Sequence, residues 1–358
     1  MNRFILSAAA LIMAATACTE SGLIDTPEMY NGLIVFNTYV GKTPVTKALN
    51  TDIDQMKGAS GGAHIYSFMC DEETNAPEFG STFMDGSLVY GTTSWEYKVG
   101  GVSEVVYWPG TSKLAFVAYN LAADNCINST TQTSTGFDFT VNQNVASQVD
   151  LVATGLDVIS GATNGEDTQV TLSFKHLLSR VGFKVLATHS SDAAITISSV
   201  KLRGVFPKTG HVDLTLSAPS ISPITSGNNA HHYEYSLFAE DDDPFVINSS
   251  ECVTGTEDDP IGPQPIYARD VNNRYMMIMP GPQSNASIEV VYQLTGEESP
   301  NTAVLPLGND WNFTAGLSYE FILKISTASI EFDATMSDDW NTNIDGNNNT
   351  NDNINTIK

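Results

Sequence analysis

The stretch that decides the fold is Val170-Thr171-Leu172-Ser173-Phe174-Lys175-His176-Leu177-Leu178-Ser179-Arg180-Val181-Gly182-Phe183-Lys184-Val185. Every second side chain shares one face over residues 170–178, and the same spacing resumes one residue out of step over 181–185. A period of two is that of a β-strand with one face in a core. The change of phase predicts a β-bulge or a bend near Ser179–Arg180.

The same spacing continues along the chain in both directions. Three further segments alternate apolar and polar side chains, namely residues 288–294, 319–326 and 330–337. Residues 33–40 and 114–119 are largely apolar, which predicts strands that are covered on both faces. A second change of phase separates Ile195 and Ile197 from Val200 and Leu202. Beyond the first 17 residues no long run has helical spacing, and Gly, Asn, Asp, Ser and Pro cluster between the expected strands. The sequence therefore predicts an all-β protein built as β-sandwiches.

The N-terminal residues have the pattern of a lipoprotein signal peptide, residues 1–17. Arg3 precedes an apolar run over residues 4–15 that is too short to span a bilayer, and Ala15-Thr16-Ala17-Cys18 follows. Lipoprotein signal peptidase accepts small residues before a cysteine whose thiol carries diacylglycerol. After the cut, the new amino group of the cysteine receives an acyl chain such as palmitate. We therefore expect Cys18 to be the lipidation site and the membrane anchor. An ordinary secretory signal, cut after Ala17, is the alternative.

Length and charge bound the domain count and the partners. The chain has 358 residues and a net charge of −25, with no basic patch, so nucleic acid is not an expected partner. The length predicts two domains. We place their boundary in the Gly- and Asn-containing break at residues 160–167, which gives domains over residues 18–162 and 163–340, and a second candidate boundary lies at 217–229. Residues 341–358 are rich in Asn, Asp and Thr, and we expect a flexible tail.

Catalytic and metal-binding patterns do not emerge from the sequence. It has no nucleophile elbow, no zinc-protease motif and no phosphate-binding glycine loop. His176 lies on the inward face of its strand, where a buried, hydrogen-bonded histidine is expected. Adjacent strand residues such as His231 and His232 face opposite sides and do not chelate one metal easily. The acidic turn at residues 240–243 lacks the glycine and spaced glutamate of a calcium loop, so we expect no enzyme activity, cofactor or metal.

Three cysteines remain after Cys18, namely Cys70, Cys126 and Cys252. Their spacing is not that of a zinc site. One disulfide with one free thiol, or three free thiols, are both compatible with this number.

A glycan-binding surface module is a second functional hypothesis, because such modules are also β-sandwiches. They stack exposed aromatic side chains on sugar rings. The candidate tryptophans are Trp95, Trp108, Trp311 and Trp340, each next to an expected strand.

Several segments resemble the fimbrillin family, the Mfa-like subunits of fimbriae from Gram-negative gut and oral anaerobes. Residues 172–181, Leu-Ser-Phe-Lys-His-Leu-Leu-Ser-Arg-Val, are similar to that family's Phe-x-His strand and its Leu-Ser-Lys/Arg-Val turn. Other similar segments follow the family's order: Val106-Tyr107-Trp108-Pro109 with residues 114–119, then residues 149–153, 275–280, 315–321 and 330–340.

The resemblance implies two transthyretin-like Greek-key β-sandwich domains in tandem and delivery to the outer membrane as a surface-exposed lipoprotein. It also implies a structural subunit of a fimbria that supports cell adhesion, with other fimbrial subunits as partners through β-strand addition and with ligands on host or bacterial surfaces. In that family a surface protease removes the first strand, and a neighbouring subunit fills the groove with a C-terminal strand. Here residues 31–40 are the candidate first strand and residues 330–340 the candidate donor.

One feature departs from the family pattern. No arginine lies between Arg3 and Arg180, so an arginine-specific protease finds no site after the first strand. Either the protease cuts at Lys42, Lys47 or Lys57, which fits a shaft subunit, or the subunit keeps its lipid and first strand, which fits an anchor.

Overall fold

The computed structural model describes most of the chain between residues 31 and 337. The described residues are 31–40, 56–58, 61–110, 112–162, 165–188, 194–227, 230–237, 243–252, 263–266, 275–283, 285–308, 311–326, 329–337 and 355–357. The expected signal peptide, Cys18, the acidic residues 240–242, Trp340 and most of the expected tail lie outside them.

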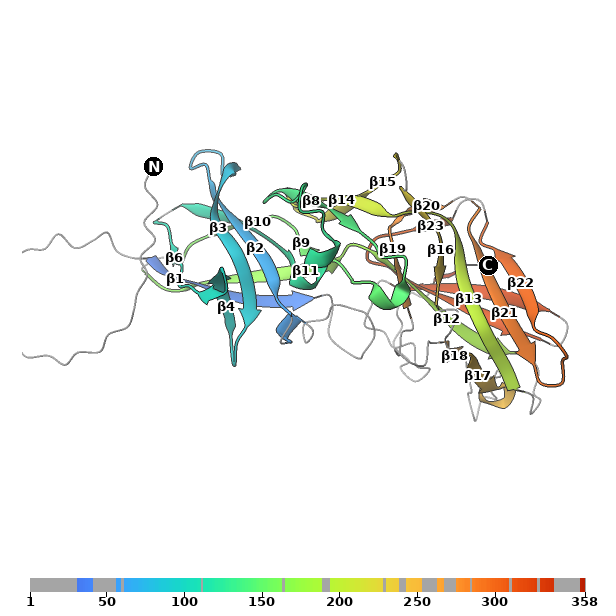
Figure 1. Ribbon diagram of the computed structural model, residues 1–358. Coiled ribbons are helices and arrows are strands. Elements are labelled where there is room, and N and C mark those ends of the chain that lie inside the picture. The colour runs from blue at the N-terminus through green and yellow to red at the C-terminus, as the bar shows by residue number, and fades with distance from the viewer. Residues whose placement is uncertain are drawn as a thin grey trace, which may run out of the picture.

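The first half of the chain forms a ten-stranded sheet, on the left in Figure 1. Its strands are β1 (Asn31–Val40), β2 (Ala63–Cys70), β3 (Pro77–Tyr90), β4 (Trp95–Val99), β5 (Val102–Ser103), β6 (Tyr107–Trp108), β7 (Lys113–Asn120), β9 (Val152–Thr154), β10 (Asp157–Ser160) and β11 (Thr168–His176). They follow the order β5-β4-β3-β2-β7-β9-β11-β1-β6, and β10 pairs with β7. This sheet is bent around a core cluster that contains Ile65, Phe116 and Phe174.

The second half forms two larger sheets, on the right in Figure 1. One contains β12 (Ser179–Ala187), β18 (Gln264–Pro265), β19 (Tyr275–Ile278), β24 (Ser318–Ile325), β25 (Ile330–Ser337) and β26 (Asn355–Ile357). The other contains β13 (Ala194–Pro207), β16 (His231–Ser236), β17 (Phe245–Asn248), β21 (Ser287–Leu294) and β22 (Asn301–Pro306). A small sheet pairs β20 (Gly281–Gln283) with β23 (Trp311–Phe313). Apolar faces of these sheets share one core cluster with Phe183, Val290 and Phe321.

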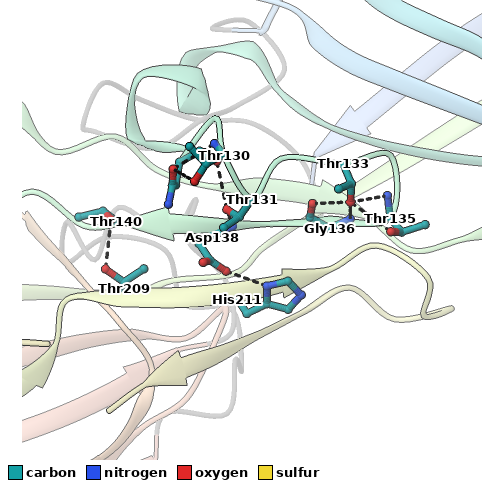
Figure 2. Close-up of polar contacts among 10 residues, drawn as sticks. Thr130, Thr131, Thr133, Thr135, Gly136, Asp138, Thr140, Thr209 and His211 are labelled. Carbon is teal, nitrogen blue, oxygen red and sulfur yellow. Dashed lines mark hydrogen bonds and ion pairs between the residues drawn. The ribbon is translucent and has the colours of Figure 1, made fainter. Parts of the chain in front are cut away.

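A three-stranded sheet joins the two halves. Strand β8 (Gly136–Thr140), from the first half, pairs antiparallel with β14 (Thr209–Asp213), which pairs in turn with β15 (Ser220–Ile224). Figure 2 shows two side-chain bonds across this junction, the Asp138 carboxylate with His211 Nδ1 at 2.8 Å and Thr140 Oγ1 with Thr209 Oγ1 at 3.1 Å. The larger core cluster also runs through both halves, so the two are packed as one unit.

The protein is all-β, as predicted. Helical structure in the described residues is limited to 3₁₀ segments η1 (Leu121–Cys126), η2 (Val145–Ser147) and η3 (Ser249–Glu251) and a helical turn at residues 56–57. No helix in the described part of the chain is long and apolar enough to cross a membrane.

The two predicted changes of phase have different causes. Residues 170–185 form no single bulged strand, because β11 ends at His176 and β12 begins at Ser179 in another sheet. Of the bulge and the bend that the sequence predicted as alternatives near Ser179–Arg180, the chain has a bend, at Leu178. In β13 the register does shift between Ile197 and Ser199, which confirms the irregularity expected there.

The division into domains at 162/163 stays a prediction. Hydrogen bonding changes from one sheet to the other at Leu177–Leu178, between β11 and β12.

Candidate assembly site around the first strand

Strand β1 is held by partners that are distant in sequence. It pairs in parallel with β11 over seven residue pairs, from Ile34↔Thr168 to Val40↔Phe174, and antiparallel with β6 on its other side. The Leu33 amide also donates to the Asp167 carboxylate at 2.9 Å. Thus β1 completes the first sheet between β11 and β6.

The side chains of β1 alternate between the core and the surface. Ile34, Thr38 and Val40 are buried, and Phe36 packs edge-on against Phe116 with 6.2 Å between ring centroids. Tyr39 lies on the outward face and is about half exposed. The structure confirms the strand predicted at residues 31–40, whereas the prediction that both of its faces are covered is wrong, because Val35 and Tyr39 are exposed.

A small groove of about 240 Å³ runs beside the N-terminal half of β1. Residues 33–36 of β1 form one wall, and residues 95–97 and 103–106 form the other. Val105, at 69% exposed, leaves apolar surface open at this edge. The part of the sheet that holds β1 is therefore incompletely covered.

Strand β25, the candidate donor, belongs to the six-stranded sheet of the second half, which is on the right in Figure 1. It forms an antiparallel hairpin with β24 over eight residue pairs, and β26 pairs with its other side. Ala334 is fully buried, and Phe332 packs edge-on against Phe321 at 5.8 Å between ring centroids. The predicted strand at residues 330–337 is confirmed, while residues 338–340 lie outside the described part.

His176 is the buried, hydrogen-bonded histidine that the sequence predicted. Its Nδ1 lies 2.7 Å from Oδ2 of Asp150, whose side chain is fully buried. Asn120 donates its amide to the Asp150 carbonyl and accepts a bond from the Val152 amide. This network joins β7, β9 and β11 around the C-terminal end of the strand that holds β1.

The adjacent histidines His231 and His232 contact different partners. His232 Nε2 lies 2.9 Å from the Val141 carbonyl across the junction, and burial lowers the pKa of this imidazole. His231 Nε2 contacts the Thr225 carbonyl at 3.2 Å. Nowhere in the described residues do three His, Cys, Asp or Glu side chains meet in a group suited to a metal ion.

The three described cysteines are free thiols. Cys70 and Cys252 are buried and Cys126 is half-buried, and burial raises the pKa of all three. Of the two arrangements that the sequence allowed, the structure has three free thiols.

The sequence offered four tryptophans as candidates for sugar stacking, and for two of them the prediction is wrong because they are buried. Trp108 is 3% exposed and donates its indole N–H to the Ser112 carbonyl. Trp311 is 8% exposed and lies among aromatic side chains of the larger core cluster. Trp95 is half-buried and packs edge-on against Tyr90. Trp340 lies outside the described residues.

A family model described as fimbrillin-like matches residues 46–340. The chain belongs to the fimbrillin-like family. The match begins after β1 and includes β25, so it covers the candidate donor strand and not the candidate first strand.

Similar solved structures come from species of Bacteroides and Parabacteroides. A fimbrial protein from Bacteroides vulgatus ATCC 8482 aligns at a TM-score of 0.60 and 16% identity, covering 86% of this fimbrillin-like chain and 99% of its own. A putative cell adhesion protein from Bacteroides uniformis ATCC 8492 aligns at 0.49 and 15% identity, over 87% and 99%. A fimbrial assembly protein from Parabacteroides distasonis ATCC 8503 aligns at 0.39 and 11%, over 86% and 94%. No curated protein matches the chain.

Sequence reasoning missed the junction between the halves of this fimbrillin-like protein. Gln148 donates to the Met277 carbonyl at 2.9 Å and accepts from the Met277 amide at 2.6 Å, so its side chain acts as an extra strand partner across the junction. The two residues are 129 positions apart, and nothing in their local sequence indicates that they meet.

Proposed function

We propose that this chain is a structural subunit of a surface fimbria, assembled by exchange of β-strands between subunits and supporting cell adhesion. Family membership and the fold shared with a fimbrial protein support the fimbrial role. Cys18, as the lipidation site, would attach the newly exported subunit to the outer membrane.

The observation that carries strand exchange is a match between β1 and β25. The inward side chains of β1 run Ile34, Phe36, Thr38, Val40, and those of β25 run Ile330, Phe332, Ala334, Met336. Strand addition depends on backbone hydrogen bonds for strength and on alternate side chains that fill matching pockets for specificity. A neighbour's β25 segment, laid parallel to β11, would place an isoleucine and a phenylalanine where β1 places its own.

The energetic case rests on apolar burial. Removal of β1 would expose the cluster around Phe116 and Phe174 and leave an unpaired edge on β11. An open apolar edge of this kind attracts another strand. A subunit that has lost β1 is therefore driven to accept a replacement, while a subunit that retains β1 is closed to exchange at this place.

Intact mass spectrometry of sheared surface fibres and of the outer-membrane fraction tests this function. A subunit in the fibres that begins after Lys42, Lys47 or Lys57 is the result expected for a shaft subunit. A chain that begins at acylated Cys18 and copurifies with other pilins is the result expected for an anchor. A chain found in neither fibre nor complex, in cells that make fimbriae, contradicts the proposal.

A further inference from the structure

An open cavity of about 520 Å³ lies between β2, β3 and the turn before β8, and none of its lining residues lines the groove beside β1. It is lined by His64, Tyr66, Asp85, residues 79–82 and residues 132–134, and we name it the polar hollow. Its volume is within the range of about 300–1,000 Å³ that is usual for small-molecule sites.

Two irregularities in β3 shape the polar hollow. Phe68 pairs with Thr82 and Cys70 pairs with Pro77, so residues 78–81 of β3 face a single residue of β2. The extra residues carry the strand away from its partner, and such bulges are frequent beside functional sites. Gly80 is at this place, and a Cβ added to it would meet no atom within 4 Å.

The floor of the polar hollow is a fixed array of aromatic and polar groups. Gln132 donates its amide to the Tyr119 hydroxyl at 2.6 Å, and the Tyr119 ring stacks on His64 with 5.3 Å between centroids. His64 Nε2 lies 3.4 Å from the Asp85 carboxylate, and the Asp85 amide donates to the Tyr97 hydroxyl at 3.1 Å. These contacts hold an amide, an imidazole and a carboxylate in place before any ligand arrives.

The wall formed by residues 132–134 is also held by hydrogen bonds, as Figure 2 shows. The Thr133 hydroxyl donates to the Gly136 carbonyl at 3.0 Å and accepts from the Gly136 amide at 3.2 Å. On the preceding side, Thr131 donates its hydroxyl to the Asn128 carbonyl and accepts from the Asp138 amide. A wall that is already ordered loses little conformational entropy on binding.

We propose that the polar hollow binds a neutral saccharide. Its lining combines the Asp85 carboxylate, the Gln132 amide and the hydroxyls of Ser81, Thr82 and Ser134 with the half-buried ring of Phe79. A sugar ring is complementary to this surface. It has many hydroxyl groups that donate and accept hydrogen bonds, and it has an apolar face of C–H groups.

Charge selects against other ligands. The lining contains no Lys or Arg, and the whole chain carries a net charge of −25, so an anionic ligand such as a sulfated or sialylated glycan is repelled. An apolar ligand would strip water from the carboxylate and the amide without replacing their hydrogen bonds. Asp85 is 59% exposed at its side chain and is therefore accessible to a hydroxyl group.

Calorimetric titration of the mature chain with a panel of neutral hexoses, N-acetylhexosamines and their disaccharides tests the proposal. At least one should bind with a dissociation constant of about 1 mM or tighter. Asp85→Asn and Gln132→Ala should each weaken that binding at least tenfold. Gly80→Tyr should do the same by narrowing the hollow while leaving its polar groups intact.

Glu104→Gln is the matched control, because it removes one exposed carboxylate from the same half of the molecule outside the hollow. It should leave the affinity unchanged, and circular dichroism should show every variant folded. The absence of neutral saccharide binding, a preference for sulfated or sialylated sugars, or equal affinity in all four variants would overturn the proposal. Because the unassembled chain is titrated, the outcome does not depend on strand exchange.

Discussion

The inward side chains of β1 and β25 both begin with an isoleucine and a phenylalanine, but the two strands are attached to the molecule in different ways. The contacts of β1 are to strands far away in the sequence, including a bond between residues 134 positions apart. By contrast, β25 follows β24 through a turn in which the Ser326 and Ser329 amides each bond to the other serine. Because β1 and β11 are parallel, no short turn joins them, and a strand of a separate polypeptide can take the place of β1. Strand β25, by contrast, is tethered beside β24 by their turn.

In the proposed strand exchange, this difference gives the two strands opposite roles. Loss of β1 leaves an open place in the first sheet and does not touch the second. Release of β25 requires the separation of its eight pairs with β24, but only β26 lies beyond it, so the centre of the second sheet stays closed.

The largest expected effect is in the sheet that holds β25. Lys184 on β12 and Glu320 on β24 form an ion pair of 2.8 Å, with both side chains only 4% exposed. Glu320→Ala leaves the ammonium group buried without this carboxylate and should lower the free energy of unfolding by about 3–5 kcal/mol, measured by urea denaturation.

The matched control is Lys324→Ala, on the same strand. Its partner, Asp333, is on β25, and both side chains are about one-third exposed. Breaking this pair should cost at most about 1 kcal/mol. Equal losses for the two variants would show that burial does not govern the strength of attachment in this sheet.

A loss of stability of intermediate size is expected when a phenylalanine of either strand is replaced, and it should differ between the unassembled subunit and the fibre. Phe36 and Phe332 are both half-buried with an edge-on aromatic partner, and replacement of either by alanine should destabilise the unassembled chain by about 1–3 kcal/mol. In fibres whose subunits have lost β1, only Phe332→Ala should reduce resistance to heat. Fibres that are weakened as much by Phe36→Ala would show that β1 is retained.

A pH-dependent effect is expected from the first half of the chain. Burial, reinforced by Asp85, raises the pKa of Tyr66 to about 12, and burial also raises the pKa of Tyr119. Between pH 10 and 12 the unfolded chain therefore releases phenolic protons that the folded chain keeps, and stability falls as pH rises. Tyr66→Phe should recover about 1 kcal/mol at pH 12 relative to its effect at pH 8, and an unchanged pH profile would contradict this origin.

The smallest effect concerns one candidate cleavage site. The Lys57 ammonium lies 4.8 Å from the centre of the Tyr90 ring, so this lysine is partly held against the first sheet. Lys57→Gln should cost about 0.5–1 kcal/mol in the free energy of unfolding. Thermal denaturation measures the loss, and Lys98→Gln, whose surface pair with Glu96 is 3.6 Å long, is the comparison. A larger loss at Lys98 would show that the ring contact contributes nothing.

The strands were predictable from local sequence, and their partners were not. Alternation identified β11 and β25, because burial on one face has a period of two, and an apolar run identified most of β1. The same signal could not distinguish a bulge from a bend near Ser179–Arg180, since two strands separated by two residues produce the pattern of one bulged strand. His176 was recognisable as buried from its face alone.

The sites that depend on distant contacts gave no local signal. The polar hollow requires Gln132 to reach Tyr119 and the bulge in β3 to lie opposite. Trp108 and Trp311 were candidates because of their chemistry, yet their neighbours bury them. Three-dimensional arrangement therefore decided which aromatic and polar side chains face solvent.

A cysteine crosslink between subunits tests the central claim most directly. If β25 of one subunit replaces β1 of the next, Glu331 takes the place of Val35, which pairs with Gln169. Gln169→Cys with Glu331→Cys, in a Cys126→Ser background, should then give a ladder of disulfide-linked subunits in oxidised fibres, since paired strand residues lie within the Cα separation of about 4.4–6.8 Å that a disulfide needs. Gln169→Cys with Asp333→Cys is two residues out of register and should give little crosslinking. The account predicts a ladder for the first pair alone; no ladder, or equal ladders for both pairs, would contradict it.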